Sequence, residues 1–285
     1  MKAAPFAYHV AGSAEQAVAL LGELAPQGGR ILAGGQSLVP IMAFRLAAPE
    51  HLIDITRAEE LRGCTVDGAA LRIGAGTRHA AFQRPVADGP LGRLLAELCR
   101  HIAHAPIRAR GTFGGSLAHA DPASEWCLAL ATLGGEVVAR SRTGTRRIAA
   151  EAFFTGIMTT ALHEDEVLTE AALPLLPRDA RFGFHEVTRR AHDFALAMTL
   201  ATWRLVDGVI VEPRVGVGGA EPVPRRIPEA EAALAGQPAT EPVFARAANA
   251  AADCVLPMED LQADAAFRRD LVRATVRRAL AWSVY

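Results

Sequence analysis

Lysine is almost absent from this sequence. Of its 30 basic residues, all but Lys2 are arginines. A phosphate-binding loop of the P-loop type needs a lysine to reach the phosphates, and Schiff-base catalysis needs an interior amine. Both kinds of site are therefore excluded beyond position 2. The 31 acidic residues bring the formal net charge to −1, which argues against a nucleic-acid-binding protein.

Clustered cysteines and long apolar runs are also missing. The four cysteines, Cys64, Cys99, Cys127 and Cys254, include no CxxC pair. Iron–sulfur clusters and structural zinc sites usually need grouped thiolates, so we predict that this chain holds no metal. No run reaches the roughly 18 apolar residues of a membrane-spanning helix, and the first residues form no apolar targeting segment. These features predict a cytoplasmic protein with reduced thiols and no membrane span.

The chain is long enough to bury a substantial core, since 51% of its 285 residues are hydrophobic. Ser13 and Gln16 form a capping box that starts a helix. With short strands at 30–33 and 51–55, this helix makes the first 55 residues a small α/β layer. The other predicted features are, in chain order, a hairpin at 65–74, a helix at 91–102, an irregular segment at 108–125, an apolar helix at 126–133, strands at 136–139 and 166–173, a break at 174–179, antiparallel strands at 181–190, 197–206 and 209–218, and helices from about 227 to 285.

Two glycine pairs are the strongest chemical signal. Gly34-Gly35 and Gly114-Gly115 lie 80 residues apart, and each is followed by a short polar residue and an apolar one. Glycine lets consecutive backbone N–H groups turn toward one anion and lets the chain approach a ligand closely. Hydroxyls at Ser37, Thr112 and Ser116 add neutral donors. Two such loops suit a pyrophosphate clasp without lysine, and each pair also suits an ordinary tight turn.

Other motifs for phosphate binding or catalysis fail. Gly74-Ala75-Gly76 begins like a Rossmann fingerprint, but His79 stands where the third glycine belongs. No GxSxG elbow is present, so a serine triad is not predicted. His101, His104 and His119 lie close in sequence without an HExxH pattern, and sugar or phosphate contacts explain that segment better than a metal does.

Two acidic residues follow the second glycine pair. Asp121 precedes a proline, and Glu125 follows Ser124 at the start of the apolar helix. One interpretation is that Ser124 and Glu125 only cap this helix. The other is that a carboxylate here accepts hydrogen bonds from a ribityl or ribose hydroxyl. Cys127, two residues further on, is predicted to be a core residue.

Residues 33–40 (AGGQSLVP) and 111–122 (GTFGGSLAHADP) together resemble the two FAD-binding loops of the molybdopterin dehydrogenase flavoproteins. These are the medium subunits of carbon monoxide dehydrogenase-type enzymes and the flavin domain of xanthine dehydrogenase. The resemblance extends over nearly the whole chain, including residues 102–108, 164–168 and 189–195. Two long glycine motifs in this order and at this separation are much more specific than either loop alone.

The resemblance implies an α+β fold. Residues 1–176 would form a two-subdomain FAD-binding domain of the vanillyl-alcohol-oxidase (PCMH) type, with subdomains of about 1–55 and 56–176. Residues 177–285 would form a C-terminal domain with a three-stranded antiparallel sheet and helices.

The resemblance also implies a set of residues that hold FAD, and no catalytic residue. Glu125 stands where better-known members have Asp, Phe194 replaces a tyrosine, and His185 occupies the place of a lysine in the xanthine dehydrogenase branch. The implied cofactor-binding residues are Ile31, Leu32, Ala33, Gly34, Gly35, Gln36, Ser37, Leu38, Ile102, Thr112, Gly114, Gly115, Ser116, Asp121, Glu125, Leu168, His185 and Phe194.

The function implied by the resemblance is that of an FAD-binding electron-transfer subunit of a molybdenum hydroxylase. It would accept electrons from an iron–sulfur subunit and pass them to an external acceptor. The implied partners are a large subunit with the molybdenum cofactor and a small subunit with two 2Fe–2S clusters, assembled as a dimer of heterotrimers. Two alternatives stay open: a free-standing FAD-dependent oxidoreductase of the same superfamily, and an interaction subunit that has lost the cofactor.

Overall fold

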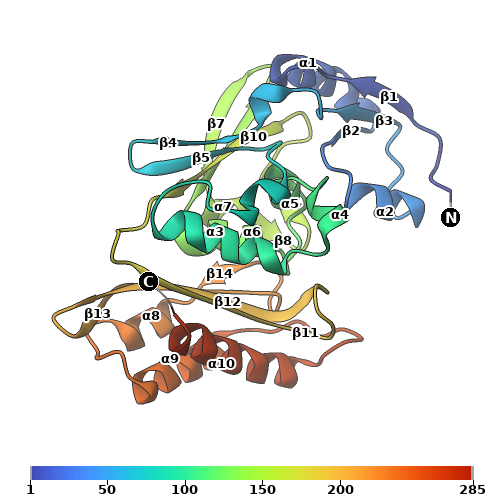
Figure 1. The fold of residues 1–285 in the computed structure, drawn as a ribbon. Coiled ribbons are helices and arrows are strands. Elements are labelled where there is room, and N and C mark those ends of the chain that lie inside the picture. The colour runs from blue at the N-terminus through green and yellow to red at the C-terminus, as the bar shows by residue number, and fades with distance from the viewer. Residues whose placement is uncertain (1, 284–285) are drawn as a thin grey trace.

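A computed structural model describes residues 2–283 of the protein. Figure 1 shows two sheet-containing layers at the top, helices in the middle, and a third sheet backed by helices at the bottom. Within the described residues, no helix is both long enough and apolar enough to cross a membrane.

The N-terminal layer is a three-stranded parallel sheet in the order β1-β3-β2 with a helix packed on it. Its elements are β1 (Ala7–Val10), α1 (Ala14–Leu24), β2 (Gly29–Leu32), α2 (Leu38–Ala43) and β3 (His51–Asp54). The Ser13 side chain accepts from the backbone N–H of Gln16, as the capping box predicts. The predicted α/β layer is confirmed. Strand β1 was not predicted, because its side chains are mostly exposed and form no apolar run.

The second layer is a five-stranded antiparallel sheet in the order β4-β5-β10-β6-β7. Its central strand β10 (Val167–Pro174) is buried on both faces, which explains its nearly continuous apolar sequence. The outer strands are β4 (Cys64–Asp67), β5 (Ala70–Gly74), β6 (Glu136–Ser141) and β7 (Gly144–Ala149). A short helix α7 (Ala150–Phe153) and a two-stranded hairpin, β8 (Phe154–Gly156) and β9 (Thr159–Thr160), follow β7.

Helices cover one face of this sheet. They are α3 (Pro90–His101), α4 (Ala105–Arg108), α5 (Phe113–His119) and α6 (Glu125–Leu133), with a 3-10 turn at His79–Gln83 beside α3. Two further 3-10 turns, Ala25–Gln27 and Glu59–Leu61, follow α1 and β3. The prediction that residues 108–125 are irregular is therefore wrong for α5. Its glycines obscured a helix that is stabilised by tertiary contacts.

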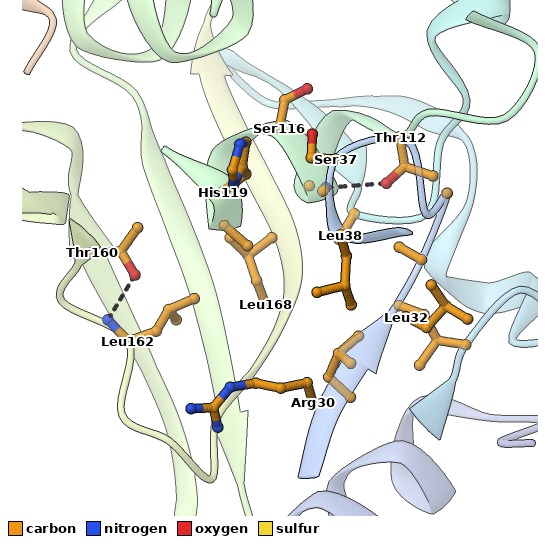
Figure 2. A pocket seen from close by; sticks show the side chains of 18 of the residues that line it. Arg30, Leu32, Ser37, Leu38, Thr112, Ser116, His119, Thr160, Leu162 and Leu168 are labelled. Atoms are coloured by element: carbon orange, nitrogen blue, oxygen red, sulfur yellow. Dashed lines mark hydrogen bonds between the residues drawn. The ribbon is translucent and has the colours of Figure 1, made fainter. Parts of the chain in front are cut away.

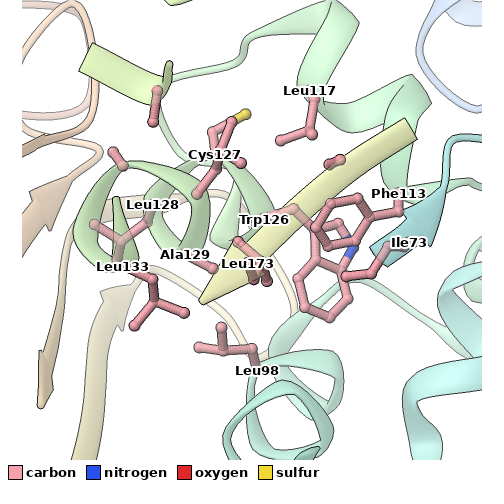
Figure 3. Close-up of a cluster of buried hydrophobic side chains, with 14 of the residues drawn as sticks. Ile73, Leu98, Phe113, Leu117, Trp126, Cys127, Leu128, Ala129, Leu133 and Leu173 are labelled. Carbon is pink, nitrogen blue, oxygen red and sulfur yellow. The ribbon is translucent and has the colours of Figure 1, made fainter. Parts of the chain in front are cut away.

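Helix α6 lies at the centre of the protein and is buried along its length. Figure 3 shows Trp126 and Phe113 side by side in the core, with Cys127 on the same helix as Trp126. The Trp126 and Phe113 rings lie 5.1 Å apart. Cys127 is fully buried, which confirms its predicted place in the core.

The C-terminal part has a four-stranded antiparallel sheet in the order β11-β12-β13-β14. Its elements are β11 (Arg181–Thr188), β12 (Ala195–Val206), β13 (Val209–Gly218), β14 (Arg225–Arg226), α8 (Pro228–Leu234), α9 (Glu241–Cys254) and α10 (Ala265–Ala281). The three predicted strands are confirmed, and β14 is a fourth that was not predicted. Because β14 is only two residues long, it has no alternating pattern of apolar and polar residues from which it could be predicted.

Arg268 ties α10 to the sheet from inside the core. Its side chain is 3% exposed and donates from Nη1 to the carbonyls of Leu196 and Gly219, at 2.6 and 2.8 Å. Its Nη2 pairs with Asp260 at 2.6 Å. A buried guanidinium that satisfies carbonyls of two strand ends is costly to remove, since its partners are left unpaired.

We therefore expect Arg268→Leu to lower the free energy of unfolding by about 3 kcal/mol, as for other broken buried charge networks. Arg273→Leu on the same helix is the matched control, because Arg273 is partly exposed and pairs with Asp270 at the surface. It should cost no more than about 1 kcal/mol. Urea unfolding followed by circular dichroism measures both, and equal losses would contradict this account.

Candidate functional site

A cavity of about 500 Å³ opens between the N-terminal layer and the helices of the second layer. Figure 2 shows Ser37, Ser116 and Thr112 toward one end of it and Arg30 at the other, with Leu168 and Leu38 facing each other between them and His119 near Leu168. The volume lies in the range of small-molecule and cofactor sites. The walls come from β2 and the loop after it, from residues 75–79, from α5, and from residues 158–168.

The first glycine pair forms a tight turn after β2. Gly35 has a φ of +70°, which favours glycine. The Gln36 side chain donates from Nε2 to the carbonyl of Gly34 at 2.9 Å and so closes the turn. Within residues 2–283 no group pairs with the hydroxyl of Ser37, which lines the cavity. This hydroxyl is therefore available to a ligand.

The second glycine pair does not form a turn. Gly114 and Gly115 lie in the first turn of α5, where the hydroxyl of Thr112 accepts from the N–H of Gly115 at 3.0 Å. The interpretation of this pair as an ordinary tight turn is therefore wrong. Thr112 caps the helix by accepting, so its O–H, like those of Ser37 and Ser116, donates to no group of the described chain.

The two loops touch through backbone, with no room for side chains. A Cβ on Gly34 would lie 2.3 Å from the carbonyl oxygen of Arg110 and 2.7 Å from Cα of Gly111. Gly114 is confined by the end of β5 instead, since a Cβ on it would lie 2.4 Å from Cβ of Ala75. Glycine is therefore required here by close approach, and the loops hold a fixed spacing across the cavity.

The other end of the cavity is charged. Glu166 accepts from Nε and Nη2 of Arg146 at 2.6 and 2.7 Å, and from the backbone N–H of His163 at 2.7 Å. The hydrogen bonds from Arg146 are the main reason why the pKa of Glu166 lies below its usual value. Arg30 also reaches this end, from β2. The carboxylate of Glu166 is thus satisfied by the protein and orders the segment at residues 161–166.

Most of the sequence-predicted cofactor residues line this one cavity. They are Ile31, Leu32, Ala33, Gly34, Gly35, Gln36, Ser37, Leu38, Thr112, Gly114, Gly115, Ser116 and Leu168. The topology thus brings together two loops and a strand from distant parts of the chain.

Five predicted residues lie outside the cavity lining. Ile102 is buried at the end of α3, and Asp121 accepts from the N–H of Ala123 at 2.9 Å. His185, on β11, contacts Arg278 and Trp282, and Phe194 is 70% exposed in the loop before β12. Their roles in cofactor binding stay predictions, as does that of Glu125.

Glu125 lies at the first position of α6, after its N-cap Ser124. Burial, together with the carboxylates of Glu186 and Asp121, raises the pKa of Glu125 to about 8. Glu186 itself accepts from Nδ1 of His101 at 3.0 Å, and its other oxygen is buried without a partner. Three elements, α3, α6 and β11, therefore bring ionisable side chains together at the junction with the C-terminal sheet.

Several cavity residues were missed at the sequence level. Arg30 lies within a strand, and His79 belongs to a segment rejected as a Rossmann motif. The wall at residues 158–164 is made by the turn and second strand of a short hairpin and by the residues after it. Only the glycine-rich run at 74–76 offered a signal, because it marks a close backbone approach. The described residues contain no group of three or more His, Cys, Asp or Glu side chains placed to hold a metal ion.

A cavity with two glycine-rich walls, free hydroxyls and no Rossmann turn is typical of a protein that binds a phosphate-bearing cofactor through backbone amides and hydroxyls. The fit to a dinucleotide rests on glycine-rich walls packed too closely for side chains and on the hydroxyls of Ser37, Thr112 and Ser116 in the cavity lining.

The chain belongs to the FAD-binding family of the molybdopterin dehydrogenases. The family model described as FAD binding domain in molybdopterin dehydrogenase matches residues 4–176, and that described as CO dehydrogenase flavoprotein C-terminal domain matches residues 182–283. FAD is therefore the cofactor, and the chain is an oxidoreductase subunit.

Relatives match over their full length. The nicotine 6-hydroxylase medium subunit of Paenarthrobacter nicotinovorans is 36% identical over 98% of both chains. The carbon monoxide dehydrogenase medium chain of Hydrogenophaga pseudoflava is 34% identical over 98% of this chain and 97% of its own.

Solved structures agree with these relatives. A chain of carbon monoxide dehydrogenase from Hydrogenophaga pseudoflava superposes with a TM-score of 0.94 at 36% identity, over 99% of this chain and 98% of that one. A chain of quinoline 2-oxidoreductase from Pseudomonas putida 86 superposes with a TM-score of 0.91 at 32% identity, over 99% of this chain and 97% of that one. The predicted α+β fold is confirmed.

We expect Gly34→Ala to weaken FAD binding by about 5- to 150-fold, because the new Cβ forces the loops apart and overpacking of this kind costs about 1–3 kcal/mol. Gly156→Ala is the control, since a Cβ added at Gly156 would come no closer than 3.8 Å to its nearest neighbour, Cβ of Thr159. Quenching of flavin fluorescence during titration measures the affinity. If Gly34→Ala bound FAD like the parent chain, the loop contact would not set the geometry of the site.

The raised pKa of Glu125 predicts that the free energy of unfolding depends on pH. Its pKa is raised in the folded state, so between about pH 5 and 8 the folded chain binds a proton that the unfolded chain releases. Stability should therefore fall as pH rises, by about 1.4 kcal/mol per pH unit from this group. Glu125→Gln should remove this component from urea-unfolding series at pH 5 to 8. Parallel slopes for the two proteins would refute the assignment.

Proposed function

We propose that this chain is the FAD-carrying electron-transfer subunit of a molybdenum hydroxylase complex. Electrons reach its FAD from an iron–sulfur subunit and leave to an external acceptor. The observation that carries the proposal is the match, over 98% of both chains, to a medium subunit of nicotine 6-hydroxylase, combined with a cavity built from both glycine loops.

The residues of this chain bind and orient FAD. The backbone of Gly34 to Ser37 and of Thr112 to Ser116 would hold the pyrophosphate, and Leu168 supplies an apolar wall. When bound, FAD supplies the redox chemistry, because it takes up and releases electrons. The protein keeps the loops at fixed spacing and excludes water from the inner wall.

The same comparison supports the proposed partners. The relatives' names describe medium or α subunits of multi-subunit enzymes. By that likeness, a large subunit with the molybdenum cofactor and a small subunit with two 2Fe–2S clusters accompany this chain, in a dimer of heterotrimers. The substrate then binds the large subunit.

Purification from the cells that produce this chain tests the proposal. A tagged chain should co-elute in size-exclusion chromatography with two other subunits, and molybdenum, iron and FAD should rise and fall together in the fractions. FAD without iron or molybdenum in a stable single-chain protein would instead identify a free-standing oxidoreductase. A chain that neither contains nor takes up FAD would overturn both functions.

A further inference from the structure

His79 occupies the point where the two glycine loops meet. It lines the cavity, is 4% exposed, and begins the 3-10 turn His79–Gln83. Its backbone N–H donates to the carbonyl of Gly111 at 3.0 Å. Its ring lies against the same residue, because a Cβ on Gly111 would be 2.6 Å from Nε2 of His79. Gly111 in turn is the residue that Gly34 contacts.

Trp126 fixes the tautomer of this ring. Its indole Nε1–H donates to Nδ1 of His79 at 3.0 Å. An indole nitrogen is only a donor, so Nδ1 must be unprotonated and the proton of the neutral ring is on Nε2. Within residues 2–283, no group accepts from Nε2. His79 lines the cavity, and the N–H of Nε2, on the side of the ring away from Trp126, is its unused donor.

The ring is also neutral. Burial, followed by the charges of Arg78 and Arg108, lowers the pKa of His79 to about 4. Trp126 is fully buried and packs against Phe82 and Phe113, with ring separations of 4.9 and 5.1 Å. The side chain that orients His79 is therefore held by the core itself.

We propose that His79 is a cofactor-binding residue that donates from Nε2 to a pyrophosphate oxygen of FAD, and that Trp126 is the positioning residue that holds it in this tautomer. The proposal rests on the proposed binding of the pyrophosphate between the two loops. It adds a directional side-chain donor to loops that otherwise offer backbone amides and serine hydroxyls, and it does so without lysine.

Variants of His79 separate this role from simple packing. His79→Leu removes the donor and should weaken FAD binding roughly 10- to 100-fold, as expected for one hydrogen bond to a charged group. His79→Gln keeps an N–H donor at a similar reach and should retain most of the affinity. Thermal unfolding of each FAD-free variant confirms that the chain is folded. His104→Leu is the control, because His104 is exposed and does not line the cavity.

Trp126→Phe tests the positioning role. Without the indole donor, His79 is free to place its proton on Nδ1, so FAD binding should weaken by a smaller factor than in His79→Leu. In the double variant the two effects should not add, because Trp126 acts through His79. Additive losses would show that Trp126 only supports the core.

Nuclear magnetic resonance of the chain with ¹⁵N-labelled histidine gives a readout independent of affinity. The FAD-free chain should show one histidine, absent in His79→Gln, that stays neutral with its proton on Nε2 from pH 8 down to pH 5. Added FAD should shift that proton downfield.

A proton on Nδ1 of His79, or equal FAD affinity of His79→Leu and the parent, would overturn the inference while FAD binding itself stands. A parent chain that does not bind FAD at all would instead contradict the proposed function, and with it the proposed acceptor of the His79 proton.

Discussion

The close backbone contact between the two glycine loops is the constraint on which the rest of the site depends. Gly34 lies against Arg110 and Gly111 of the second loop, at a separation that leaves no space for a Cβ, and Gly114 is held just as closely against Ala75 at the end of β5. The contact joins the parallel N-terminal sheet to the helices of the second layer. Because the sheets supply rigid supports on both sides, the distance between the loops is set by the fold and not by the ligand. Such preorganisation lowers the cost of ordering a cofactor.

The core and the cofactor site share residues. Helix α6 is buried in the middle of the protein, and its Trp126 contributes both to an aromatic cluster and to the hydrogen bond that orients His79. A buried indole N–H needs an acceptor, and a neutral histidine at a cavity wall needs a defined tautomer. One hydrogen bond meets both requirements. Because Trp126 packs against Phe113 and also orients His79, a change in core packing near Phe113 would alter the orientation of the His79 ring at the cavity.

A second group of ionisable side chains lies at the junction with the C-terminal sheet. Glu186 on β11 meets His101 from α3, and its carboxylate adds to the burial that raises the pKa of Glu125 on α6. Residues assigned to the cofactor by resemblance alone, among them Ile102 and His185, gather near this junction instead of lining the cavity. The structure therefore separates a loop-built cavity, supported by its own geometry, from a set of residues whose roles rest on the family likeness.

The sequence by itself determined the elements with clear periodicity, such as α1, α3 and strands β11 to β13, and the two glycine loops. It did so because apolar spacing and backbone freedom are local properties. Only the tertiary structure decided that the second glycine pair belongs to a helix, that β1 and β14 join sheets, and that His79 enters the site. His79 acquires its burial, its tautomer and its position from Trp126 and Gly111, which are distant in sequence. No local pattern encodes contacts of that kind, because they exist only once the two layers have packed together.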